Sequence, residues 1–206
     1  MVKVKICGIT NVEDALAAVE AGADYIGFIF FPPSPRNVDL NTVREILKNL
    51  PKGVKNVAVT VNAEVDFLKK LLEEGFDLLQ LHGDENPSIL KDLPKERVIK
   101  VFRVRDSFNE ENLKGWEGIY AYLLDTYKKG TYGGTGETFN WDIARGLVEK
   151  GLKIFLSGGL KPENVARAVE IVKPYAVDVS SGVEAYPGKK DLKKLEEFIK
   201  KAKKLG

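Results

Sequence analysis

The segment that decides the fold is residues 2–30, which read VKVKICGITNVEDALAAVEAGADYIGFIF. Residues 2–6 form a short apolar run rich in β-branched side chains, and residues 25–30 form a second run of the same kind. Between them, Asn11 can cap a helix and Gly22 can end it. A strand, a helix and a second strand in this order predict a parallel βαβ unit.

The same alternation recurs along the whole chain. The predicted strands lie at residues 2–6, 25–30, 56–61, 78–81, 98–102, 119–124, 153–156 and 176–179. The predicted helices lie at residues 12–22, 40–50, 64–74, 87–93, 109–113, 141–150, 162–172 and 190–204. Eight strand–helix units predict an α/β fold in which residues 1–206 form a single (β/α)8 TIM barrel. An open doubly wound sheet is the alternative.

Composition excludes several classes of protein. The 206 residues carry a formal net charge of +2, which is too small to indicate a nucleic-acid partner. With one cysteine and one histidine, neither a disulfide framework nor a zinc site is expected, so we predict no metal and no cofactor. Because there is neither a spanning apolar run nor a signal peptide, we expect a cytoplasmic protein that does not enter a membrane.

Unusual residues gather just after the predicted strands. They are Cys7, Arg36, Asn62, His82, Asp125, Gly158, Gly159, Ser180 and Ser181. In a barrel the carboxyl ends of all strands converge on one face, where the active sites of such enzymes are built. This placement favours the barrel over the open sheet and predicts an active site at that face.

Two of these residues suit acid–base chemistry. Cys7 follows the first strand, and Asp125 ends the sixth. A thiol with a pKa of about 8.5 is only a few per cent ionised at neutral pH, so its surroundings must tune it if it is to act as a base. A carboxylic acid in an apolar setting can donate a proton near neutral pH. Alternatively, Cys7 is a small buried hydrophobe and Asp125 is a cap or an ion-pair partner.

Glycine-rich and serine-rich loops predict a bound phosphate. The loops LSGGL at residues 156–160 and VSSGVE at 179–184 follow strands seven and eight, where barrels of this type frequently bind phosphate. We therefore assign Gly158, Gly159, Ser180 and Ser181 to a phosphate site; the alternative is that the glycines only permit tight turns. The glycine-rich loop 128–136 can approach a ligand closely, and Gly134 and Gly136 are its predicted contacts.

Three further residues could bind substrate. Arg36 follows a proline-rich loop and could grip a carboxylate, or it could be a solvated surface side chain. His82 could serve as a base or could bond to the backbone. Asp178 could orient a hydroxyl or an amine, or could pack inside the barrel.

Taken together, the motifs resemble a known family. They are KICGIT at 5–10, FPPSPR at 31–36, QLHG at 80–83, LDT at 124–126, GGTG at 133–136, LSGGLKPEN at 156–164, VDVSSGVE at 177–184 and PGKKD at 187–191. Their order and spacing resemble the phosphoribosylanthranilate isomerases of tryptophan biosynthesis. The resemblance implies that Cys7 is the general base, that Asp125 is the general acid, and that Arg36 holds the anthranilate carboxylate. It also implies that Asp178 orients the substrate. Thr60 and Asn140 depart from the usual pattern of the family.

The implied reaction is an Amadori rearrangement of N-(5-phosphoribosyl)anthranilate to 1-(2-carboxyphenylamino)-1-deoxyribulose 5-phosphate by a monomer or homodimer. Two alternatives stay open. A histidine-pathway aminoaldose isomerase would use two aspartates, and Cys7 counts against it. A non-catalytic barrel could bind a sugar phosphate, but the pairing of Cys7 with Asp125 counts against that reading.

Overall fold

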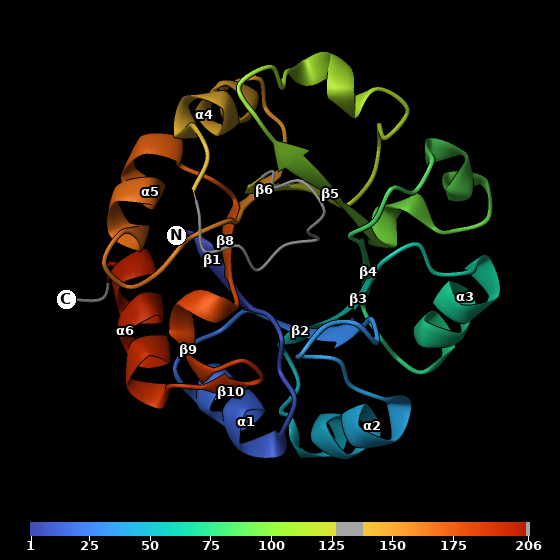
Figure 1. Ribbon diagram of the computed structural model, residues 1–206, viewed down its shortest axis with the longest axis vertical. Coiled ribbons are helices and arrows are strands. Elements are labelled where there is room, and N and C mark those ends of the chain that lie inside the picture. Colours follow the sequence, from blue (N-terminus) through green and yellow to red (C-terminus); the bar gives the residue numbers. More distant parts are fainter. Residues whose placement is uncertain (127–137, 205–206) are drawn as a thin grey trace.

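The computed structural model describes residues 1–126 and 138–204. Eight parallel strands close into a barrel in which each strand pairs with the next along the chain (Figure 1). The strands are β1 (Lys3–Ile6), β2 (Tyr25–Phe30), β3 (Lys55–Thr60), β4 (Leu78–Leu81), β5 (Val98–Val104), β6 (Ala121–Thr126), β7 (Ile154–Leu156) and β8 (Ala176–Val179). The pairing of β1 with β8 closes the barrel. The predicted barrel is confirmed, and the open sheet was wrong.

In the described part of the chain, six α-helices form a ring around the strands (Figure 1). They are α1 (Val12–Glu20), α2 (Leu40–Asn49), α3 (Val65–Glu73), α4 (Trp141–Glu149), α5 (Val165–Val172) and α6 (Leu192–Ala202). Short polar side chains begin several of them: Asn11, Asp39 and Asp191 each accept the backbone N–H three residues further along. Among the described residues, no helix is long and apolar enough to cross a membrane.

The two positions that depart from the family pattern have local roles. Asn140 precedes α4 and accepts the Asp142 N–H at 3.0 Å, which is the cap that an aspartate would also provide. Thr60 ends β3 and is fully buried, and its hydroxyl has no hydrogen-bond partner in the described part of the chain.

The segments after β4 and β5 differ from the expected helices. They are 3-10 turns: η1 (Pro87–Lys91) and η2 (Lys95–Arg97) follow β4, and η3 (Glu110–Leu113) follows β5. The apolar patterns there are shorter than an α-helix needs for stability. A hairpin made of β9 (Glu184–Tyr186) and β10 (Lys189–Lys190) after the short turn η4 (Ser181–Val183) was not predicted, because its residues show no apolar alternation.

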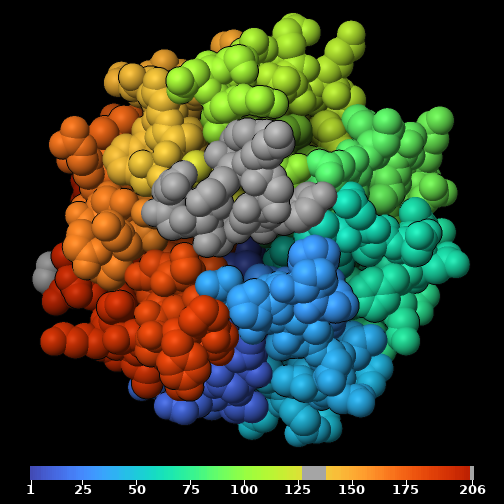
Figure 2. Space-filling model, viewed as in Figure 1, coloured from blue at the N-terminus to red at the C-terminus, as the bar shows by residue number. Residues whose placement is uncertain are grey.

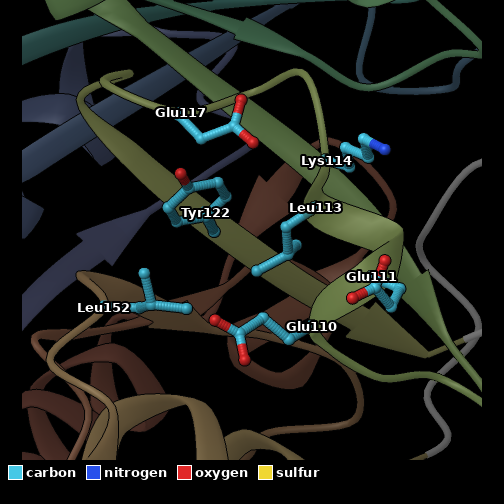
Figure 3. Close-up of a pocket in the computed structure, with 7 residues that line it drawn as sticks. All are labelled: Glu110, Glu111, Leu113, Lys114, Glu117, Tyr122 and Leu152. Atoms are coloured by element: carbon cyan, nitrogen blue, oxygen red, sulfur yellow. The ribbon is translucent and has the colours of Figure 1, made fainter.

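A cavity of about 380 Å³ lies beside η3, against the outer side of the barrel wall (Figure 3). Its lining residues are Glu110, Glu111, Leu113, Lys114, Glu117, Tyr122 and Leu152. None of the predicted site residues lines it. The cavity is therefore separate from the predicted active site, which lies at the carboxyl ends of the strands.

The interior of the barrel has its own apolar core, separate from the layer between strands and helices. Its buried members are Cys7, Tyr25, Val57, Val59, Leu78, Ile99, Val101, Ala121, Leu123, Phe155 and Ala176. At the amino-terminal end of the strands, aromatic side chains close this core. Tyr25 lies edge-on to Phe155, with 5.2 Å between ring centroids, and its hydroxyl is 2.7 Å from that of Tyr120.

Candidate active site

The predicted acid and base lie inside the same end of the barrel. Cys7 and Leu123 both belong to the interior core, and Asp125 shares the inward face of β6 with Leu123 because side chains alternate along a strand. Figure 2 shows this end of the molecule, where the segment after β2, in blue, lies beside the segment after β8, in red. The topology therefore brings together residues that are far apart in the sequence.

Cys7 is held by backbone contacts on two sides. Its N–H donates to the Val179 carbonyl at 2.9 Å, and its own carbonyl accepts from Lys190 Nζ at 2.6 Å. Burial raises the pKa of the Cys7 thiol, Lys5 opposes this rise, and Asp178 adds to it; the pKa stays above its ordinary value. The resting side chain is a thiol at neutral pH, with a cation close enough to favour its ionisation.

Asp125 lies beside His82. One carboxylate oxygen accepts the Thr126 N–H at 2.8 Å, and the other is 3.5 Å from His82 Nε2. The other ring nitrogen, Nδ1, is 3.2 Å from Gln80 Nε2. Within residues 1–126 and 138–204, the hydrogen-bond partner of the ring is therefore the Gln80 side chain and not a backbone group, and Asp125 lies close to Nε2 without a hydrogen bond.

Arg36 is bound by a buried glutamate. Its Nε and Nη2 both reach Glu184, with the shortest distance, 2.6 Å, between Nη2 and Oε1. The Arg36 side chain is only 12% exposed, so the expectation of a solvated surface arginine was wrong. The contacts with Glu184 involve Nε and Nη2 of the guanidinium.

Asp178 faces the interior, and both of its oxygens are engaged. Lys5 Nζ donates to Oδ1 at 2.8 Å, and the Ser157 hydroxyl donates to Oδ2 at 2.9 Å. The carboxylate is therefore held in a fixed orientation directly beneath the open end of the barrel.

The two predicted phosphate loops touch each other. Gly158 and Gly159 have φ values of 90° and 66°, in the region that favours glycine. A Cβ on Gly182 would collide with the Leu160 carbonyl, so the loops after β7 and β8 pack without a gap. The Ser180 hydroxyl in the second loop is buried and has no partner within residues 1–126 and 138–204.

Two predicted ligand contacts, Gly134 and Gly136, lie outside the described residues. Among the residues that are described, no group of three or more His, Cys, Asp and Glu side chains could hold a metal ion.

Comparison with known proteins decides the family. Residues 4–201 match the family described as N-(5'phosphoribosyl)anthranilate (PRA) isomerase. The chain belongs to this family. It is 58% identical over 204 residues to the N-(5'-phosphoribosyl)anthranilate isomerase of Aquifex aeolicus, covering 98% of this chain and 99% of that one.

Solved structures of the phosphoribosylanthranilate isomerase family have the same architecture. Monomers generated from the dimeric enzyme of Thermotoga maritima are 41% identical, with a TM-score of 0.84 and coverage of 99% of this chain and 100% of that one. A family member in complex with reduced 1-(o-carboxyphenylamino)-1-deoxyribulose 5-phosphate is 40% identical, with a TM-score of 0.86 and the same coverage.

Sequence analysis missed several charged residues that surround the expected isomerase site. Lys5 lies under Cys7, and Glu184 and Lys190 lie behind Arg36 and Cys7. The alternation in VKVKIC was a usable signal for Lys5, since it places Lys5 and Cys7 on one face of β1. Glu184 and Lys190 lie in the quoted motifs VDVSSGVE and PGKKD, but no alternation places their side chains, because both belong to the unpredicted hairpin.

Proposed function

We propose that this chain isomerises N-(5'-phosphoribosyl)anthranilate to 1-(o-carboxyphenylamino)-1-deoxyribulose 5-phosphate, the Amadori step of tryptophan biosynthesis. The observation that carries the proposal is the placement of Cys7 and Asp125 on the inward face at one end of a barrel whose family match spans residues 4–201. The complex of a relative with the reduced product supports the substrate class.

The chemistry follows from these two side chains. Asp125, as the acid, protonates the ribose ring oxygen, and the bond from this oxygen to C1 breaks to leave a protonated imine. Cys7, as the thiolate, takes the proton from C2, and the electron pair of that bond forms the C1=C2 double bond of an enolamine. The enol then loses its hydroxyl proton while C1 gains one, which gives the ketone. Atoms and electrons balance without a cofactor. Each positioned acid or base typically contributes about 10²–10⁴-fold to the rate.

The remaining residues suit the parts of this substrate. We assign the anthranilate carboxylate to Arg36, whose guanidinium edge opposite Glu184 can bind a carboxylate. We assign the phosphate to the loops that contain Gly158, Gly159, Ser180 and Ser181. His82 beside Asp125 and Asp178 beside Ser157 are proposed to orient the reacting ribose. Gly134 and Gly136 stay predicted contacts.

We also propose that residues 1–206 act as one catalytic domain in the cytoplasm, as either a monomer or a homodimer. The Thermotoga maritima relative is described as dimeric. Sedimentation of the purified protein at several concentrations distinguishes the two states.

The test generates the labile substrate in place from anthranilate and phosphoribosyl pyrophosphate and follows the loss of its fluorescence. Purified protein is expected to accelerate that loss, and Asp125→Asn is expected to lower kcat strongly while product binding persists. The absence of any acceleration by the wild-type protein would refute the isomerase assignment. Full activity in Asp125→Asn would refute the role of this residue.

A further inference from the structure

Lys5 is a charged side chain in an unusual place. It is fully buried on the inward face of β1, where the interiors of such barrels are filled mainly by branched apolar side chains. Removing an ammonium from water is costly unless it is paired and hydrogen-bonded. Asp178 provides this pairing at 2.8 Å, and Ser157 fixes the other oxygen of the carboxylate. The proposed chemistry gives Asp178 a role in orienting the ribose but gives Lys5 none.

Gly27, on the neighbouring strand β2, shows how near Lys5 lies to the proposed base. A Cβ built on Gly27 would be 2.8 Å from Cys7 Sγ and 3.2 Å from Lys5 Nζ. Because Cys7 Sγ and Lys5 Nζ both lie this close to the same Cβ position, the two atoms are no more than about 6 Å apart. At such a distance a positive charge favours the ionisation of a thiol. Gly27 therefore leaves the space in which the thiol and the ammonium meet.

Several charged groups face Cys7. Burial raises its pKa; Lys5 from β1 is the largest opposing influence, Asp178 from β8 adds to the rise, and Lys190 from β10 also opposes it. Lys190, however, directs its Nζ to the carbonyls of Cys7 and Ser180, at 2.6 and 3.1 Å. It also lies 3.5 Å from Glu184, which in turn binds Arg36. At the same end of the barrel, the described titratable groups also include Asp125 and His82, which lie 3.5 Å from each other.

Lys5 keeps its own proton. Burial alone would lower the pKa of Lys5, but the charge and hydrogen bond of Asp178, together with Cys7, more than reverse this and leave the pKa above its usual value. The side chain is consequently an ammonium whenever Cys7 ionises, and the proton that moves in the reaction is the one exchanged between Cys7 and the substrate.

We propose that Lys5 is a positioning residue for the proposed isomerisation: its ammonium, held in place by Asp178, stabilises the Cys7 thiolate that takes the proton from substrate C2. In this arrangement Asp178 acts through Lys5 as well as on the substrate. The inference rests on the proposed function for its catalytic meaning, but its electrostatic part concerns the free protein alone.

The test uses the single cysteine of the chain. The rate of alkylation by iodoacetamide, followed by intact-mass spectrometry across pH, reports only the Cys7 thiolate. Lys5→Met is expected to raise the midpoint of this profile by about one pH unit or more. Lys100→Met is the matched control, because Lys100 is also a buried lysine, paired with Glu85 at 2.7 Å, but lies on the outer face of β5. It is expected to leave the midpoint unchanged.

A second variant protects the test against misfolding. Lys5→Met leaves the Asp178 carboxylate without its cation, which can destabilise the protein. The double variant Lys5→Met/Asp178→Asn removes both charges, and its midpoint is also expected to lie above that of the wild type, since Lys5 outweighs Asp178 at the thiol. Asp178→Asn alone is expected to lower the midpoint.

The outcomes separate cleanly. A wild-type midpoint in Lys5→Met or, where that variant does not fold, in the double variant would overturn the proposal. A shift equal to that of Lys100→Met would do the same. Alkylation needs no substrate, so this result stands independently of whether isomerase activity is found. Where activity is found, the acid limb of the kcat/KM profile should move together with the alkylation midpoint.

Discussion

The two ends of the barrel bury polar groups in opposite ways. At the amino-terminal end, the Tyr25 and Tyr120 hydroxyls bond to each other at 2.7 Å, and Lys153 Nζ lies 3.7 Å from the centre of the Tyr120 ring. At the carboxyl end, the buried polar atoms without a partner among the described residues include His82 Nε2 and the Ser180 hydroxyl.

An unsatisfied buried polar group costs about 1–3 kcal/mol, so its presence at a strand end needs a reason. A phosphorylated, carboxylated substrate would supply the missing partners at the carboxyl end. At the amino-terminal end, the Tyr25 and Tyr120 hydroxyls inside the barrel satisfy each other, and the unpartnered Asn56 Oδ1 lies on the outer face of β3. We therefore assign the aromatic cluster to the stability of the fold. Changes at the carboxyl end should therefore affect catalysis, and changes at the aromatic end should affect stability.

The largest effect is expected from Cys7→Ala. Loss of the proposed base should lower kcat by about 10²–10⁴-fold, while thermal unfolding changes little because a small side chain is replaced by another small one. The fluorescence assay and a thermal melt of the same sample measure the two effects. Near-full activity in this variant would transfer the role of base to His82.

At the opposite end, Phe155→Ala should lower the free energy of unfolding by about 3–5 kcal/mol. Phe155 is fully buried and packs against Tyr25 and Tyr175, with ring centroids 5.2 and 5.9 Å away. Urea unfolding measures the loss, and Phe155→Leu, which leaves a smaller cavity, serves as the matched control. The kcat of the folded fraction should stay within a few-fold of wild type. A large fall in the kcat of the folded fraction would contradict the division between a catalytic end and a stabilising end.

A smaller effect is expected from Glu184→Gln. The neutral amide holds the Arg36 guanidinium less firmly, so KM should rise by about tenfold while kcat changes little. Glu74→Gln is the matched control, because Glu74 also binds an arginine, Arg44, through two oxygens, but on the outer surface. Initial rates across substrate concentration give both constants. An unchanged KM in Glu184→Gln would separate Arg36 from carboxylate binding.

Features that depend on residues close together in the sequence were predictable, and contacts between residues far apart in the sequence were not. The strands were predicted because apolar runs and caps are local, and the placement of Cys7 and Asp125 at one end of the barrel was predicted because the ends of parallel strands converge. The ion pairs around them were not found. Lys5 and Asp178 are 173 positions apart, and Arg36 and Glu184 are 148 apart. Such pairs exist only once β8 has closed onto β1.

The unpredicted features of the fold have the same origin. The hairpin of β9 and β10 is stabilised partly by Lys190, whose amine reaches the Cys7 carbonyl on the first strand. After β4 and β5, 3-10 turns stand where α-helices were predicted. The apolar patterns there span so few residues that they cannot distinguish a 3-10 turn from an α-helix.

The smallest effect is expected from Tyr120→Phe. It removes one hydroxyl from the pair with Tyr25 and should lower the free energy of unfolding by about 0.5–1.5 kcal/mol, measured by urea unfolding, with kcat and KM unchanged. Tyr186→Phe is the control, because Tyr186 is 64% exposed and its loss should leave stability unaltered. Because the aromatic end contains no substrate contact in the proposed mechanism, a changed KM in Tyr120→Phe would mean that the two ends are coupled through the interior core. A loss of stability with unchanged kcat and KM would show that the Tyr120 hydroxyl contributes to the stability of the fold and not to catalysis.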